Sequence, residues 1–215
     1  MPKIISSKDH QALEKALEAL KRGRVVAIPT ETFYGLAVDY RNEKALKRLF
    51  ILKKRPEEKP VLLLIGDLTQ LNEIVQDVPS LARNLIERFW PGPLTLVLPA
   101  RPHLSFFLTA GTGKVAVRLS SHQIPLQLAQ ALGRPITGTS ANLSGRPPAR
   151  TPAEILAQLP EVDLIIDAGA LPAEAPSTIV EVSGESLRLL REGEIPWREI
   201  CKIIDKGLRQ QQKGV

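Results

Sequence analysis

Short apolar runs separated by amphipathic segments constrain the fold of this chain more than any other feature. Most runs contain four or five residues and are rich in valine, isoleucine and leucine. Runs of this length are typical of buried strands, and the periodic segments between them are typical of helices that cover a sheet. The predicted strands are Val25 to Ile28, Val61 to Ile65, Leu94 to Leu98, Val115 to Leu119, a short one at Ile136, Leu164 to Asp167, Thr178 to Val182 and Leu187 to Leu190.

Helices are predicted where apolar residues recur every three or four positions. In the first helix Leu13, Ala16, Leu17 and Leu20 share one face, and Gly23 ends it. The predicted helices are DHQALEKALEALKRG, Glu43 to Leu52 with Leu46, Leu49 and Phe50 facing inward, Pro79 to Phe89, Pro125 to Leu132, one that begins at the capping box Thr151-Pro152-Ala153-Glu154, and Pro196 to about Leu208.

The connections between these elements are of two kinds. Ser183-Gly184-Glu185 joins two strands in a hairpin, whereas other strands are joined through helices. This mixture predicts one α/β domain, residues 1–208, built on a twisted mixed β-sheet. The tail RQQQKGV, residues 209–215, is expected to be flexible.

The chain is basic, with a net charge of +6 and an isoelectric point of about 9.6. This balance favours phosphate-bearing partners, either nucleotides or RNA, although a merely basic protein has the same composition. One cysteine excludes an internal disulfide framework, and no apolar run is long enough to cross a bilayer. Since the N-terminus lacks a secretory leader, we expect a cytoplasmic protein with no membrane partner.

Several common catalytic devices are missing from the sequence. The histidines, His10, His103 and His122, form no metal-ligand pattern, so we expect no protein-bound metal. There is no Gly-x-Ser-x-Gly elbow and no Gly-x-Gly-x-x-Gly loop, and AGTGK is too short for a Walker motif. Phosphate must therefore be handled by another device.

Polar clusters instead follow the predicted strands. PTETFYGLAVD comes directly after the first strand, KKRPEEKP and TSANLSG lie beside others, and Arg118 and Arg191 lie at strand ends. Ligands of open α/β sheets tend to bind at such ends. The alternatives are a solvated charged turn for KKRPEEKP, ordinary turn chemistry for TSANLSG, and an Arg118 that is merely paired or snorkelling.

Taken in order, these stretches resemble the YrdC-like family of threonylcarbamoyl-AMP synthases. The matching stretches are PTETFYGLAVD, KKRPEEKP, RFWPGPLTLVL, VAVRL, TSANLSG, STIV and LREGEI, from about Gly23 to Ile195. The resemblance implies a three-layer α/β fold of the YrdC/RibB type, with a twisted mixed sheet around a basic concave pocket.

The family reaction joins L-threonine, bicarbonate or carbon dioxide, and ATP into threonylcarbamoyl-adenylate and pyrophosphate. A partner, a threonylcarbamoyl-transferase complex, then modifies an adenosine of tRNA, and RNA is a second candidate partner of the chain itself. The resemblance implies ATP as substrate, with Mg²⁺ carried in by ATP. Glu31 and Asp39 are nearby candidates for accepting the proton of threonine's ammonium group.

The resemblance also assigns residue roles. The family pairs a Lys-x-Arg with a Ser-x-Asn, and the matching catalytic residues are Lys53, Arg55, Ser140 and Asn142. Arginine and lysine are the usual partners of phosphate. The implied ATP-binding residues are Arg55, Lys59, Lys114, Ser140, Ala141, Asn142 and Arg191, and the implied threonine-binding residues are Thr32, Arg118, Thr139 and Ser177.

Three positions depart from the family pattern. Leu64 stands where many members carry a histidine near the threonine, and Lys114 stands where many have a small hydroxyl residue near ATP. Ser120 occupies a position where proline is frequent. His122 is interpreted as a structural residue.

Two other functions remain open at this point. One is an RNA-binding module without catalysis, although only 4% of the residues are aromatic and base stacking is poorly provided. The other is a carbamoyl-adenylate-forming relative, but such proteins are much longer and carry acylphosphatase and zinc modules.

Overall fold

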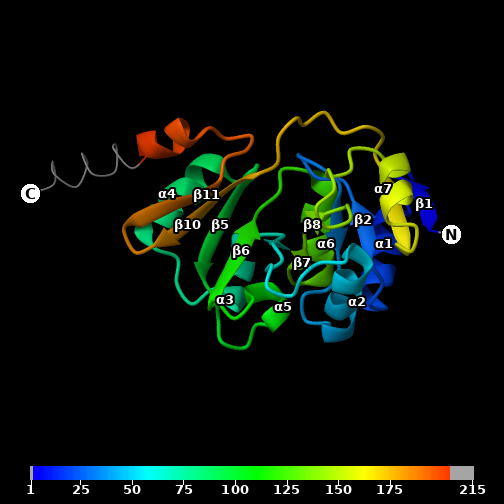
Figure 1. Cartoon of the computed structure of the whole chain (residues 1–215), viewed down its shortest axis with the longest axis horizontal. Helices are drawn as coiled ribbons and strands as arrows, with labels where there is room; N and C mark the ends of the chain where they lie inside the picture. Colours follow the sequence, from blue (N-terminus) through cyan, green and yellow to red (C-terminus); the bar gives the residue numbers. More distant parts are fainter. Residues whose placement is uncertain (1, 204–215) are drawn as a thin grey trace, which may run out of the picture.

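The computed structural model describes residues 2–203 and has mixed α/β architecture (Figure 1). The strands are β1 (Lys3–Ser6), β2 (Val26–Ile28), β3 (Gly35–Ala37), β4 (Leu63–Leu64), β5 (Leu94–Pro99), β6 (Lys114–Arg118), β7 (Ile136–Thr137), β8 (Thr139–Ser140), β9 (Leu164–Asp167), β10 (Thr178–Ser183) and β11 (Ser186–Arg191). The helices are α1 (Ala12–Lys21), α2 (Glu43–Lys53), the 3-10 turn η1 (Leu68–Gln70), α3 (Leu71–Ile74), α4 (Ser80–Phe89), α5 (Phe106–Thr109), α6 (Gln123–Leu132) and α7 (Pro152–Gln158), and residues 197–203 are also helical. No helix within residues 2–203 is long and apolar enough to span a membrane.

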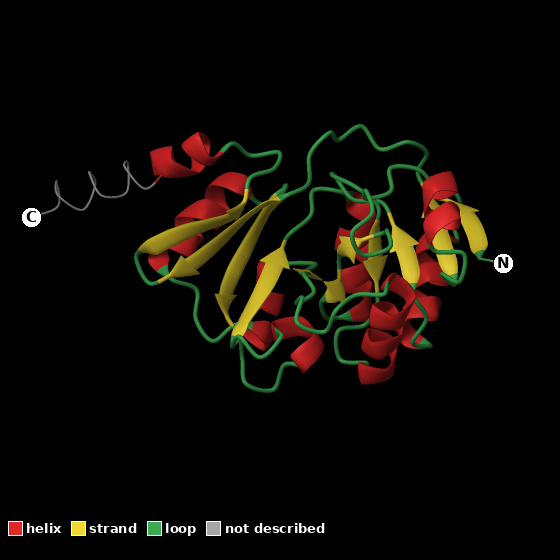
Figure 2. Cartoon of the chain, in the orientation of Figure 1, coloured by secondary structure: helices red, strands yellow, loops and turns green. Residues whose placement is uncertain are grey.

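The strands form two mixed sheets, whereas the sequence predicted one. Sheet one has the order β1-β9-β2-β3-β8 and sheet two the order β11-β10-β5-β6-β4-β7. An isolated bridge between Asp39 and Ile136 connects them. Figure 1 and Figure 2 show β5, β6, β10 and β11 in one half of the molecule and β1 and β2 in the other, with β7 and β8 between them; the loop before β10 crosses over the top from one half to the other.

Helices cover both faces of sheet one. Adjacent residues of a strand point to opposite faces. Val26 and Ile28 therefore belong to an apolar cluster with α1 and α6, whereas Val25 and Ala27 belong to a second cluster with α2 and α7. This arrangement confirms the expected three-layer α/β fold.

Helices α3 and α4 cover one face of sheet two, and α6 covers the other face at β4 and β7. Leu96 of β5 and Val117 of β6 are buried in the cluster that contains residues of α3 and α4. Their neighbours Thr95 and Ala116 point to the other face and line a cleft. The same alternation that builds the core therefore supplies one wall of a site.

Each predicted strand and helix that lies within the described residues is present, with shifted ends. The apolar run from Val61 to Ile65 forms only the two-residue β4. At α7, Thr151 Oγ1 accepts a hydrogen bond from Glu154 N at 3.2 Å, as predicted, but the Glu154 carboxylate accepts from Arg150 N rather than from Thr151 N. The predicted end of the last helix near Leu208 and the tail 209–215 lie outside the described residues.

Candidate functional site

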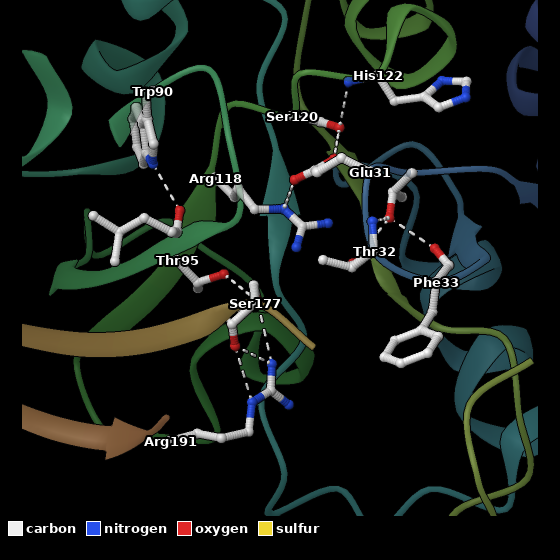
Figure 3. Close-up of polar contacts among 12 residues, drawn as sticks. Glu31, Thr32, Phe33, Trp90, Thr95, Arg118, Ser120, His122, Ser177 and Arg191 are labelled. Carbon is white, nitrogen blue, oxygen red and sulfur yellow. Dashed lines mark hydrogen bonds and ion pairs between the residues drawn. The ribbon is translucent and has the colours of Figure 1, made fainter. Parts of the chain in front are cut away.

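A cleft of about 570 Å³ lies between the open face of sheet two and the ends of β2, β3 and β8. It is lined by residues from distant parts of the chain, some of which are drawn in Figure 3. The predicted site residues in its lining are Thr32, Arg55, Arg118, Thr139, Ser140, Ser177 and Arg191. Those that do not line it are Lys53, Lys59, Lys114, Ala141 and Asn142.

Arg118 ends β6 and is almost completely buried, with 3% of its side chain exposed. Its Nε lies 3.3 Å from Oε1 of Glu31. Burial lowers the pKa of Arg118, and the charge of Glu31 partly offsets this effect. Figure 3 shows the two terminal nitrogens of the guanidinium turned away from Glu31, so they are free to meet a ligand in the cleft.

Arg191, the last residue of β11, and Ser177, directly before β10, also line the cleft. Arg191 donates from Nε and Nη2 to Ser177 O at 3.1 and 2.8 Å, and the Ser177 hydroxyl lies 2.9 Å from that of Thr95. Burial lowers the pKa of Arg191, and the positive charge of Arg118 lowers it further. The two guanidinium groups are therefore close enough to repel each other.

Arg55 is held by the loop that follows α2. Its Nε donates to Lys59 O at 3.0 Å and its Nη2 to Pro60 O at 2.8 Å, which curls KKRPEEKP around the guanidinium. Burial lowers the pKa of Arg55. The side chain of Lys59 is exposed and lies outside the cleft.

The stretch PTETFYGLAVD forms a tight turn that serves the cleft. Thr30 Oγ1 donates to Phe33 O at 2.7 Å and accepts from Thr32 N at 3.1 Å. Tyr34 is fully buried. Its hydroxyl donates a hydrogen bond to Gly169 O at 2.9 Å, and its backbone carbonyl accepts one from Ala141 N at 2.7 Å. The hydroxyl and backbone groups of PTETFYGLAVD therefore fix the loops around the cleft.

Lys53 is buried beneath the TSANLSG loop, with 1% of the residue exposed. Its Nζ donates to Ser140 O, to Asn142 O at 2.8 Å and to Asn142 Oδ1 at 3.1 Å. The Ser140 hydroxyl also donates to Asn142 Oδ1, at 2.6 Å. Lys53 thus holds the loop that presents Ser140 to the cleft.

The titration of Lys53 gives a pH-dependent prediction. Burial, together with the charge of Arg55, lowers its pKa from 10.5 to about 7. Between these values the unfolded chain binds a proton that the folded chain does not, so the free energy of unfolding rises with pH by about 1.4 kcal/mol per pH unit from this group. Denaturant titrations from pH 7 to 9 should show this slope in the wild type and not in Lys53→Met. Equal slopes would mean that the three oxygen acceptors keep the ammonium charged.

Lys114 lies on the cleft face of sheet two, but beyond the cleft. Its Nζ is 2.7 Å from Oε1 of Glu181, whose Oε2 is 2.8 Å from Nη2 of Arg188. These two cations lower the pKa of Glu181. Lys114 is therefore neutralised by Glu181 of β10, which lies two strands away in sheet two.

Gly138, between β7 and β8, makes a close approach to Leu64. A methyl group at this position would lie 2.5 Å from Leu64 Cγ, and Leu64 is fully buried. We expect Gly138→Ala to push Thr139 and Ser140 out of place and to destabilise the fold by about 1–3 kcal/mol, as overpacking generally does. Denaturation of Gly138→Ala, Leu64→Ala and the double variant checks this, because the double variant should lose less stability than the sum of the two single losses.

The remaining sequence candidates lie outside the cleft lining. His122 accepts from Ile124 N at 3.2 Å through Nδ1 and caps α6, which supports its structural interpretation. Oδ2 of Asp39 lies 3.7 Å from Nε of Arg134, with which it forms an ion pair. Within residues 2–203, no group of three His, Cys, Asp or Glu residues is arranged to hold a metal ion.

The sequence interpretation missed Thr95 and the pairing of Glu31 with Arg118. Thr95 is a buried polar residue in the apolar strand LTLVL. A hydroxyl in such a strand is the sequence signal that could have predicted a ligand site on the Thr95 face of sheet two. Nothing local in the sequence marks the pairing of Glu31 with Arg118, because the two lie far apart along the chain.

The cleft concentrates positive charge. Arg55, Arg118 and Arg191 line it, whereas Glu174 is the only carboxylate in the lining among the residues that the structure describes. Arginine stays charged in proteins, so partly buried guanidinium groups are stabilised by an anion. Fold and cleft together define an α/β protein with a cationic cleft, and such a cleft suits phosphate- or carboxylate-bearing ligands.

Comparison with known proteins identifies the family. The family model Sua5/YciO/YrdC, described as "Telomere recombination", matches residues 18–193. Relatives named threonylcarbamoyl-AMP synthase are 40% identical over 187 residues in Pyrococcus abyssi and 38% identical over 181 residues in Klebsiella pneumoniae. The structure of P. abyssi Sua5 complexed with L-threonine matches with a TM-score of 0.89 at 35% identity, and E. coli YciO with 0.80 at 26%. The chain belongs to the Sua5/YciO/YrdC family.

The matched relatives differ in length. The matches cover 86% of this chain and 55% of the P. abyssi relative, but 83% of this chain and 95% of the K. pneumoniae relative. Among the structures they cover 95% of this chain and 61% of P. abyssi Sua5, and 90% of this chain and 97% of YciO. The chain thus spans a little over half of the P. abyssi protein and nearly all of the shorter relatives.

Proposed function

We propose that this chain makes threonylcarbamoyl-AMP and pyrophosphate from L-threonine, bicarbonate or carbon dioxide, and ATP. The observation that carries the proposal is that Arg118 and Thr32 share one cavity with Arg55, Ser140 and Arg191. Its volume lies within the range of about 300–1,000 Å³ that is usual for small-molecule sites. The names of the relatives, and the threonine bound to P. abyssi Sua5, support the same reaction.

The reaction needs positioning and charge neutralisation rather than a protein nucleophile. The amine of threonine adds to the carbon of carbon dioxide and loses a proton, which gives a carbamate. A carbamate oxygen then bonds to the α-phosphorus of ATP, the bond from that phosphorus to the bridging oxygen breaks, and pyrophosphate leaves. Cations and aligned donors stabilise the charge that develops on the phosphoryl oxygens.

In this proposal the threonine lies against sheet two. The guanidinium of Arg118 binds its carboxylate, because arginine matches a carboxylate with two parallel hydrogen bonds. Thr32, Thr139 and Ser177 contact the rest of the amino acid, since all three line the cleft beside Arg118.

The nucleotide occupies the part of the cleft near the two polar loops. Arg55, Arg191 and Ser140 contact it directly, and Lys53 acts on it through the loop that it holds. The other nucleotide residues, each outside the cleft lining, are Lys59, Lys114, Ala141 and Asn142. Mg²⁺ arrives with the triphosphate as part of the substrate.

The product is a reactive mixed anhydride, so a second protein must use it. We place this chain in the cytoplasm, upstream of a threonylcarbamoyl-transferase complex that modifies adenosine in tRNA.

Pyrophosphate release tests the proposal. Purified protein with ATP and Mg²⁺ should release pyrophosphate only when threonine and bicarbonate are both present, and mass spectrometry should detect threonylcarbamoyl-AMP. Release without threonine would contradict the proposal. Salt-dependent RNA binding with no pyrophosphate release would instead favour an RNA-binding module.

A further inference from the structure

A buried carboxylate lies directly behind Arg118 and has no part in the mechanism above. Thr30 and Thr32 line the cleft, but Glu31 between them does not. Its side chain is 11% exposed and its Oε1 lies 3.3 Å from Nε of Arg118. Figure 3 shows Glu31 on the far side of the guanidinium from the terminal nitrogens.

Ser120 fixes this carboxylate from the other side. The Ser120 hydroxyl donates to Oε2 of Glu31, and its oxygen accepts from His122 N at 3.2 Å. Oε1 of Glu31 and Nε of Arg118 are buried and have no aligned hydrogen-bond partner among the described residues. The two groups are therefore held together by charge at short range, through atoms that are shielded from solvent.

A guanidinium has two edges that can meet carboxylates. In Arg118 the Nε edge is taken by Glu31, and the edge formed by the two terminal nitrogens is directed at the cleft. We propose that Glu31, held by Ser120, is a positioning residue that sets the orientation of Arg118 and thereby the affinity for the substrate carboxylate. This inference rests on the proposed function, because it takes threonine as the ligand of Arg118.

Neutralising Glu31 tests the inference. Glu31→Gln keeps the size of the side chain but removes its charge, and should raise the KM for threonine about tenfold, while kcat and the KM for ATP change little. Ser120→Ala removes one hydrogen bond and should raise the same KM about threefold. Glu31→Asp keeps the charge and should recover part of the loss. Glu73→Gln, which neutralises the partner of Arg41 outside the cleft, is the matched control.

A double-mutant cycle separates positioning from a general structural effect. In an Arg118→Ala background, Glu31→Gln should no longer weaken threonine binding measured by calorimetry. An unchanged or lower threonine KM in Glu31→Gln would overturn the inference, and so would a loss of kcat alone, which would make Glu31 a proton acceptor. If the wild type binds no threonine, the proposed function fails; if it binds threonine and Glu31→Gln binds it equally well, only this inference fails.

Discussion

We expect Arg118→Ala to lower the affinity for L-threonine about 30- to 1,000-fold, which corresponds to about 2–4 kcal/mol. The reason is that the buried guanidinium of Arg118 and the substrate carboxylate form a charge-assisted pair with two parallel hydrogen bonds. Removing the arginine also leaves Glu31 buried without its cation, so we expect a lower melting temperature as well. Calorimetric titration with threonine and thermal unfolding measure the two effects separately.

The control for this variant is another arginine of the same sheet. Arg188 pairs with Glu181, but its side chain is 68% exposed. Exposed ion pairs contribute about 0–1 kcal/mol, so Arg188→Ala should bind threonine almost as the wild type does. Arg118→Lys adds a second check, because a lysine keeps the charge but not the planar pair of donors. Threonine binding that survives Arg118→Ala in a folded protein would contradict the role of this residue.

The second large effect is expected for Lys53→Met. This change removes the donors that serve Ser140 O, Asn142 O and Asn142 Oδ1 beneath the TSANLSG loop. Asn142 Oδ1 keeps the Ser140 hydroxyl as a donor and Ser140 O keeps Asn142 N, so Asn142 O is the acceptor left without a partner, at about 1–3 kcal/mol. At about 2–4 °C per kcal/mol for a chain of this size, the melting temperature should fall by about 2–12 °C.

The loss of Lys53 should also weaken ATP binding, because Ser140 then loses its fixed position in the cleft. Lys47→Met is the matched control, since Lys47 is exposed on the same helix. A Lys53→Met protein that is as stable as Lys47→Met and has the same KM for ATP would show that Lys53 does not hold the loop.

Elements with strong local patterns could be predicted from the sequence. The α2 face with Leu46, Leu49 and Phe50 is buried as predicted, and the hairpin at Ser183-Gly184-Glu185 joins β10 to β11. The two-residue β8 and the three-residue β3 are too short to show a periodicity of their own, because they form by pairing with each other and, for β3, with β2. The division into two sheets likewise depends on pairings between distant strands, which no local pattern specifies.

The site shows the same division. Residues that interrupt an apolar strand or follow its end, such as Arg118 and Thr32, could be selected from the sequence, and both line the cleft. The contacts between site residues could not be predicted from local patterns, because only the fold brings Glu31 to Arg118 and Lys53 to Asn142. Side chains that support a site from behind carry no sequence pattern of their own, since their role depends on burial and distance.

A crystal structure of the protein with L-threonine and a non-hydrolysable ATP analogue tests the central claim most directly. We predict that the threonine carboxylate lies on the terminal nitrogens of Arg118, with the phosphates beside Arg55 and Ser140 in the same cleft. Threonine and nucleotide bound at separate surfaces, or a threonine carboxylate with no contact to Arg118, would contradict this account.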